Sequence, residues 1–296
     1  MSGLRLLAIH AHPDDESSKG AATTAKYAAE GNVVSVLTCT GGERGDILNP
    51  AMDRPGVKEN MVNVRREEMA EAAAALGVHH LWLGHVDSGL PDNPDNLPMH
   101  ELLPEGCFAL MPDDEVAQEY VKVIRELRPH VIVTYDENGG YPHPDHLMVH
   151  RASMIAWEKA GDPNYHPELG EAWEPLKLYY SHGFVYQRMK IFHDLLEKEG
   201  KTSPYAPMMA RWDTTFGDIM ERVTTQVECA DYFSNREKAL RAHATQIDPA
   251  GAFLATSVED QQKYWPTEEF ELARTRVSTA LPETDLFAGI EKVEQS

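Results

Sequence analysis

Residues 4–39 read LRLLAIHAHPDDESSKGAATTAKYAAEGNVVSVLTC, and this stretch predicts how the chain folds. Its apolar start, Leu4–Ile9, is typical of a buried strand, and a polar run follows at residues 10–16. Residues 21–30 are good helix formers with Gly31 placed as a C-cap, and Val33–Cys39 is rich in β-branched side chains. The stretch therefore predicts a β-α-β unit, the connection that joins parallel strands.

The alternation of strand and helix continues along the chain. We expect helices at residues 62–76 and 114–127 and strands at residues 81–83 and 130–135. Such alternation is typical of an α/β, Rossmann-like fold, with a mainly parallel sheet flanked by helices.

The pattern is less regular after Gly161. A strand is expected at residues 176–180, and helices at residues 188–199, 236–243 and 268–275. We therefore expect a single domain over residues 1–296, with a Rossmann-like core in 1–160 and a C-terminal portion, 161–296, that completes the pocket.

Charge and composition exclude several classes of function. The 296 residues contain 27 Lys+Arg and 48 Asp+Glu, a net charge of −21 that is spread along the chain. This charge repels phosphate backbones and anionic lipids, so we expect neither a nucleic-acid nor a membrane partner. No apolar stretch approaches the roughly 18 residues of a membrane span, and residues 1–7 lack a signal-peptide pattern, which predicts a cytoplasmic protein. The three cysteines, without a C-x-x-C pair, indicate neither a disulfide framework nor a zinc knuckle.

Polar segments follow four of the predicted strands, at residues 12–16, 40–45, 87–89 and 136–146. The carboxyl ends of parallel strands meet at one edge of a sheet, where ligands bind. The richest pair is HPDD at residues 12–15 and YPHPDH at residues 141–146, which supplies imidazoles and carboxylates from two strand ends. Either segment alone also fits an ordinary turn or helix cap, but together they favour a metal site.

Two imidazoles and one carboxylate form the donor set of a catalytic zinc site, in which the pKa of a bound water falls to about 7. Adjacent Asp14 and Asp15 cannot easily both face the metal, so one is expected as ligand and the other as general base. His150 would share a helix face with His146 and is an alternative ligand to His143 or His146. The same donors bind Fe²⁺, as in the facial triad of iron oxygenases, but those triads generally sit on β-sandwich folds.

The motifs AHPDDE at residues 11–16 and GGYPHPDH at residues 139–146 resemble those of the zinc-dependent N-acetylglucosaminyl deacetylases, the PIG-L/LmbE-like family. The resemblance implies the following roles. One Zn²⁺ per chain is bound by His12, Asp15 and His146, and Asp14 is the general base. His143 stabilises the oxyanion and can protonate the departing amine, Tyr141 polarises the amide carbonyl, and Asp145 orients His143.

Further stretches, such as DESSKG at residues 15–20 and HATQID at residues 243–248, resemble the members of the family that cleave thiol conjugates. This implies a detoxifying amidase that cleaves the amide between an N-acylcysteine and glucosaminyl-inositol. Arg65 and Asp87 match positions that bind the inositol and sugar hydroxyls, and Lys19 is expected to contact the small-molecule substrate. For Arg65 and Lys19, ordinary helix-surface charge is the competing interpretation.

Two alternatives stay open at this point: a deacetylase that acts on N-acetylglucosaminyl-inositol with the same residues, and a non-catalytic protein that binds sugar conjugates. His243 and Gln246 recur in the family, and no role is assigned to them. The apolar residues indicate no oligomeric state.

Overall fold

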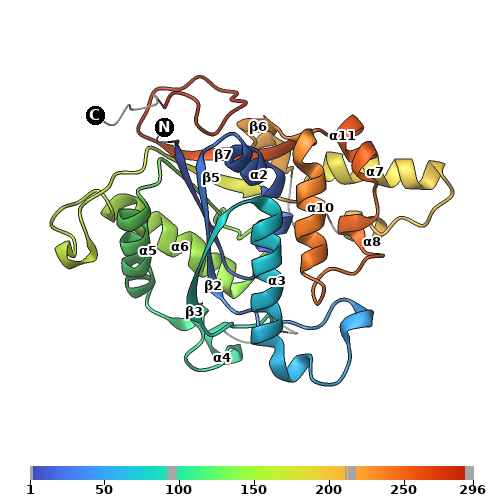
Figure 1. Cartoon of the computed structure of the whole chain (residues 1–296), viewed down its shortest axis with the longest axis horizontal. Helices are drawn as coiled ribbons and strands as arrows, with labels where there is room; N and C mark the ends of the chain where they lie inside the picture. Colours follow the sequence, from blue (N-terminus) through green and yellow to red (C-terminus); the bar gives the residue numbers. More distant parts are fainter. Residues whose placement is uncertain (1–2, 92–98, 211, 213–217, 291–296) are drawn as a thin grey trace.

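The computed structural model describes residues 3–91, 99–210, 212 and 218–290. Within these residues, seven strands form one sheet in the order β3-β2-β1-β4-β5-β7-β6 (Figure 1). The strands are β1 (Arg5–His10), β2 (Val33–Thr40), β3 (His79–His85), β4 (Val131–Thr134), β5 (Lys177–His182), β6 (Thr225–Glu228) and β7 (Thr267–Thr275). The first five strands in this order are parallel, and β7 runs antiparallel to both β5 and β6. The predicted α/β class with a mainly parallel sheet is confirmed.

Helices cover both faces of the sheet (Figure 1). Leu7 and Ile9 of β1 face the cluster that includes helices α5 and α6, whereas Leu6 and Ala8 pack in the cluster on the α3 side. Because both faces are covered, β1 is apolar at every position except its ends, as a central parallel strand requires. The longer helices are α2 (Ala21–Ala29), α3 (Met61–Leu76), α5 (Asp113–Leu127), α6 (Pro144–Lys159), α7 (Tyr186–Lys198) and α10 (Phe233–Ala242).

Shorter helices occupy the connections between these elements. The short α-helices are α1 (Asp15–Ser18), α4 (Met99–Leu102), α8 (Ala206–Met209) and α11 (Val258–Tyr264). The 3-10 helices are η1 (Pro50–Met52), η2 (Lys58–Asn60), η3 (Phe108–Leu110), η4 (Pro167–Leu169), η5 (Ile219–Glu221), η6 (Ala230–Tyr232) and η7 (Ala252–Leu254). Helices α7 and α8 share an apolar cluster of their own, built on Phe192 and Tyr205.

The prediction of a helix at residues 268–275 is wrong, because this segment belongs to strand β7. Its Glu, Leu, Ala and Arg residues favour a helix locally, but pairing with β5 and β6 overrides that preference. Phe270 is buried, and the neighbouring buried carboxylates of Glu268 and Glu269 are each paired with an arginine. The burial of these side chains against partners from other parts of the chain decides that the segment is a strand. The local sequence pattern does not contain this information.

Strands β5, β6 and β7 come from the C-terminal portion and extend the sheet that residues 1–160 begin. The division at residue 160 stays a prediction. All three cysteines are free and buried. Across the described part of the chain, no helix has both the length and the apolar character needed to cross a membrane.

A buried ion pair joins β5 to the segment after β7. The Nζ of Lys177 lies 2.5 Å from Oε1 of Glu283, and the Tyr179 hydroxyl donates to the other oxygen of that carboxylate. We expect Lys177→Met to lower the free energy of unfolding by about 3–5 kcal/mol, because it leaves a buried carboxylate without its cation. Urea unfolding measures this loss. Lys190→Met, which breaks an exposed pair with Asp194, is the control and should change stability by about 1 kcal/mol or less. Equal losses in the two variants would contradict the role of burial.

Candidate functional site

The candidate site lies at the carboxyl ends of β1 and β4. The loop that carries residues 12–15 follows β1 directly, and helix α6 begins at Pro144, ten residues after the end of β4. The side chain of His143 caps α6 by accepting a hydrogen bond from the backbone N–H of Asp145 at 3.2 Å. Proline in the first turn and this cap start the helix here, so that His146 lies in its first turn.

The structure brings His12, Asp15 and His146 together with the spacing of metal ligands. Nδ1 of His12 lies 3.4 Å from Oδ2 of Asp15, Nε2 of His146 lies 3.4 Å from the same oxygen, and the two nitrogens are 3.3 Å apart. Tetrahedral bonds of about 2.0–2.1 Å separate two ligand atoms by about 3.3–3.4 Å. The three atoms therefore fit one face of a tetrahedral metal site, and all three residues are buried. His150 instead contacts the backbone carbonyl of Tyr135.

Hydrogen bonds on the far side of each ring orient the two histidines. Nδ1 of His146 lies 2.8 Å from the carbonyl oxygen of Gly139, and Nε2 of His12 lies 3.2 Å from Oδ2 of Asp145. A proton on each of these nitrogens leaves the lone pair of the other nitrogen directed at Asp15. The outer partners thus select the tautomers that metal binding needs.

Asp15 is held as a carboxylate by its neighbours. Burial alone would raise its pKa, but the Lys19 ammonium and the imidazoles of His146 and His12 hold the pKa well below its usual range. Nζ of Lys19 lies 2.5 Å from Oδ1, and the Tyr135 hydroxyl donates to Oδ2 at 2.7 Å. Asp15 is therefore already negatively charged, as a metal ligand of this type needs to be.

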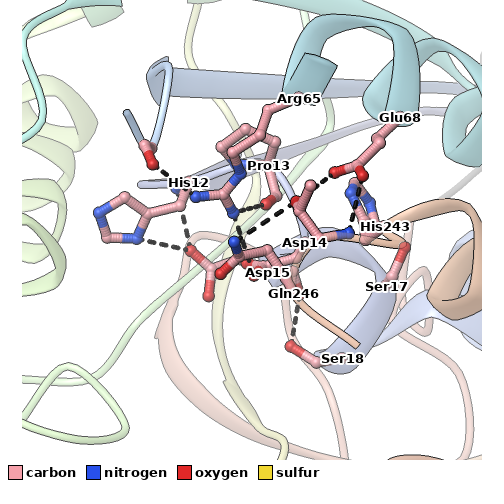
Figure 2. A network of polar contacts seen from close by, with 12 residues as sticks. His12, Pro13, Asp14, Asp15, Ser17, Ser18, Arg65, Glu68, His243 and Gln246 are labelled. Atoms are coloured by element: carbon pink, nitrogen blue, oxygen red, sulfur yellow. Dashed lines mark hydrogen bonds and ion pairs between the residues drawn. The ribbon is translucent and has the colours of Figure 1, made fainter. Parts of the chain in front are cut away.

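Asp14 has a backbone conformation that non-glycine residues rarely adopt, with φ of 124°. Its backbone N–H donates to Glu16. Its side chain accepts from Nη2 of Arg65 at 3.1 Å (Figure 2). Burial and the charge of Asp15 raise the pKa of Asp14, although Arg65 opposes the shift. The side chain is 25% exposed, so it stays accessible from solvent while Asp15 is buried.

Arg65 lies inside the protein. This burial does not agree with the competing interpretation, in which Arg65 is an ordinary charge on the surface of a helix. From α3 its guanidinium donates to the carbonyl oxygens of Gly42 and Pro13 as well as to Asp14 (Figure 2). The structure thus gives Arg65 three protein acceptors, and its predicted contact with substrate stays a prediction. Lys19 is likewise buried, against Asp15.

His143 is a neutral imidazole in this arrangement. Burial and the neighbouring rings of His12 and His146 lower its pKa to about 2. Because Nδ1 accepts from the backbone of Asp145, the ring proton lies on Nε2 and is available as a hydrogen-bond donor. The ring of Tyr141 lies 4.7 Å from that of His146, and burial together with the charge of Asp15 raises the pKa of its hydroxyl.

Two predicted residues contact His12. The carboxylate of Asp145 accepts from His12 and from the Ser88 backbone, and only its backbone N–H meets His143. The carboxylate of Asp145 therefore orients His12, and the expected orientation of His143 by Asp145 stays a prediction. Oδ1 of Asp87 lies 3.4 Å from Nε2 of His12 and also accepts from the backbone of Gly89. Burial favours a neutral His12, but these carboxylates and Asp15 raise its pKa well above the usual value.

Sequence reasoning missed a buried pair behind Asp14. Nε2 of His243 lies 2.7 Å from Oε1 of Glu16, whose other oxygen accepts from the Asp14 backbone. His243 had no assigned role, and Glu16 follows the motif without a recognised one. Gln246 donates to the carbonyl oxygen of Asp46 and so joins the same C-terminal segment to the loop after β2. A separation of 227 residues hides the pair from any local pattern.

Gly42 makes room for the Arg65 guanidinium. A Cβ atom at Gly42, where φ is +63°, would lie 2.1 Å from Nη1 of Arg65. We expect Gly42→Ala to displace Arg65 and lower activity by at least about tenfold, because Asp14, the expected general base, then loses the guanidinium that holds its carboxylate. Gly56→Ala is the matched control, because Gly56 also has a positive φ but has no atom within 4 Å of the added Cβ. It should cost only about 1 kcal/mol of stability, from backbone strain. Activity assays on both proteins, with urea unfolding as the measure of stability, test this, and equal activity losses would contradict it.

The Glu16–His243 pair makes stability depend on pH. Burial disfavours the charged form of both side chains, but each charge stabilises the opposite charge of its partner. The pKa of Glu16 therefore falls to about 2, and the pKa of His243 rises. The stabilisation is present between the ordinary values of about 4.3 and 6.5, and is lost as pH rises through the raised pKa of His243 or falls toward about 2. We therefore expect Glu16→Gln to destabilise the protein more at about pH 6 than at about pH 9. Urea unfolding of both proteins across this range measures the difference, and a constant difference would refute the pairing.

Comparison with known proteins agrees with this site. A family model described as PIG-L, GlcNAc-PI de-N-acetylase, matches residues 7–157. The chain is 56% identical over 290 residues to a protein from Streptomyces coelicolor named mycothiol S-conjugate amidase, and the match covers 97% of each chain. It is 39% identical to 1D-myo-inositol 2-acetamido-2-deoxy-alpha-D-glucopyranoside deacetylase 1 from Catenulispora acidiphila, over 97% of this chain and 89% of the relative.

A solved structure shares the fold. N,N'-diacetylchitobiose deacetylase from Pyrococcus horikoshii superposes with a TM-score of 0.58 at 17% identity, over 90% of this chain and 83% of that chain. The family model covers both motifs that carry the ligand residues, and the two relatives match nearly the whole chain. The chain therefore belongs to the GlcNAc-PI de-N-acetylase (PIG-L) family of amide hydrolases.

Proposed function

We propose that this protein is a zinc-dependent amidase that acts on S-conjugates of mycothiol. It would hydrolyse the amide between the N-acylcysteine and the glucosaminyl-inositol, and release an S-substituted N-acetylcysteine, a mercapturic acid, in a detoxification step. The observation that carries the substrate choice is the 56% identity, over nearly the full length of both chains, to the S. coelicolor protein of that name. The tetrahedral spacing of the three buried ligand atoms supports the hydrolytic chemistry.

Zinc suits the donor set of His12, Asp15 and His146. When bound there, it supplies Lewis-acid chemistry, which makes water acidic near neutral pH and polarises a carbonyl group. The same donors also bind Fe²⁺, so metal analysis of the purified protein is part of the test. The three free, buried cysteines fit a reducing compartment such as the cytoplasm.

Asp14 would take the proton of the attacking water. Its carboxylate is adjacent to the ligand Asp15, is partly exposed, and has a raised pKa, which brings its basicity closer to the operating pH. The Arg65 guanidinium holds one carboxylate oxygen and leaves the other available to water.

His143 and Tyr141 would stabilise the oxyanion that forms from the amide. Both side chains carry a proton near neutral pH, because the pKa of His143 is low enough to keep the ring neutral with N–H at Nε2 and the pKa of Tyr141 is raised. Asp14, which holds the proton taken from water, can pass that proton to the departing amine. The expectation that His143 donates that proton stays a prediction.

Substrate contacts are assigned to two further residues. Lys19 lies beside Asp15, and its amine is within reach of a group bound there. Asp87 lies beside His12 and offers a carboxylate, which accepts hydrogen bonds from the hydroxyls of a neutral sugar or inositol. For Arg65 we propose a positioning role through Asp14 together with the predicted sugar contact.

A second candidate function is deacetylation of N-acetylglucosaminyl-inositol. The 39% identity to the Catenulispora acidiphila deacetylase over 97% of this chain favours it specifically. Both reactions cleave an amide on the same glucosamine nitrogen, so only the ratio of kcat/KM on the two substrates separates them.

A paired amine-release assay tests the proposal. The zinc-loaded protein is given a fluorescent mycothiol S-conjugate and N-acetylglucosaminyl-inositol in separate reactions, with and without a chelator. We expect kcat/KM to favour the conjugate by at least about tenfold and the chelator to abolish both activities. Preference for the acetylated sugar would support the deacetylase instead.

The Asp15→Ala protein is the control for the metal assignment. Loss of a first ligand should lower zinc affinity by more than the roughly 10–100-fold typical of an outer partner, and activity should fall with metal content. Elemental analysis measures bound zinc. An Asp15→Ala protein that keeps full zinc content and full activity would contradict the ligand set.

A further inference from the structure

An apolar cavity lies between α7, α8, α10 and α11, the helices on the right of Figure 1. Its volume is ≈ 160 Å³, and an apolar cavity of roughly 150 Å³ is large enough to hold benzene. Apolar side chains make up most of the wall, among them Phe184, Met189, Phe192, Tyr205, Phe253 and Trp265. The mechanism derived above uses none of these residues.

The cavity adjoins the metal site through one side chain. Ser17 and Ser18, just after the ligand Asp15, form part of its wall, and so does Gly183 after β5. A Cβ atom at Gly183 would lie 2.9 Å from Cγ of Lys19, whose Nζ is 2.5 Å from Asp15. Lys19 therefore separates the cavity wall at Gly183 from the ligand carboxylate.

The two arginines in the cavity wall are neutralised by partners. Nη1 of Arg188 lies 3.0 Å from Glu269, and Nη1 of Arg236 lies 3.1 Å from Glu268. Arg236 also donates to the side chain of Gln261. With these charges paired inside the protein, the cavity favours an uncharged occupant over an anionic one.

We propose that this cavity is the subsite for the S-linked group of the conjugate, and that it selects uncharged groups about the size of an aromatic ring. This inference rests on the proposed function. In a cysteine amide the sulfur is only three bonds from the carbonyl carbon. The S-linked group is therefore attached close to the reacting carbon and lies near the metal site. The cavity behind Lys19 is apolar and of matching size, whereas the glucosaminyl-inositol on the other side of the amide is covered with hydroxyls and gains nothing from apolar walls.

Two substrates that differ only in the S-linked group test the subsite. Ala252 lines the cavity and is half-buried, so Ala252→Trp should fill it. We expect kcat/KM for the S-benzyl conjugate to fall at least about tenfold and that for the S-methyl conjugate to change less than about twofold. Phe253→Ala, at a 41% exposed residue of the wall, is a second variant that perturbs folding little and should lower only S-benzyl turnover, by a few fold.

Val33→Ala is the matched control, because Val33 is also exposed and apolar but begins β2, at the end of the strand away from the metal loops. It should leave both substrates unchanged. Parallel losses on the two substrates, or none, in a folded Ala252→Trp or Phe253→Ala protein would overturn the subsite while the amidase proposal stands. If the zinc-loaded wild-type protein cleaves neither conjugate, the proposed function fails, and the subsite fails with it.

Discussion

A buried carboxylate needs partners that offset the loss of its hydration. The structure around Asp15 provides such partners for its carboxylate. Its partners come from separate parts of the fold: Lys19 follows α1, Tyr135 follows β4, and His146 lies in the first turn of α6. The parallel strands β1 and β4 are adjacent in the sheet, so their loops converge at one edge. A ligand set with its charge already balanced by neighbours can exist inside the protein before any metal binds.

A second set of contacts holds the neighbouring Asp14 in its strained conformation. Arg65 of α3 donates hydrogen bonds to Pro13 and Asp14 in the loop after β1. Glu16, which is paired with His243, accepts from the backbone N–H of Asp14. Thr245, two residues after His243, donates to Glu68 of α3 and so closes the network between the C-terminal portion and the core. The C-terminal portion thus supports the proposed general base although it carries none of the proposed metal ligands.

The apolar cavity beside the site follows from the same packing. Helices α7 and α8, with Ala252 and Trp265 from the later connections, bury an apolar cluster that is separate from the two main faces of the sheet. Because β7 places Glu268 and Glu269 beside Arg236 and Arg188, the cations of the cavity wall are neutralised. The segment that local propensity assigned to a helix is therefore the one that neutralises the two arginines of the cavity wall.

By itself the sequence determined the β-α-β order, the parallel core and the two motifs that carry His12, Asp15 and His146, because these depend on local periodicity and on residue type at short spacing. Only the tertiary structure decided that residues 267–275 form a strand, that Arg65 is buried against Pro13, and that Asp145 orients His12. It also decided the pairing of Glu16 with His243. Each of these features joins groups far apart in the chain, and the burial that selects them exists only once the sheet and its helices have packed.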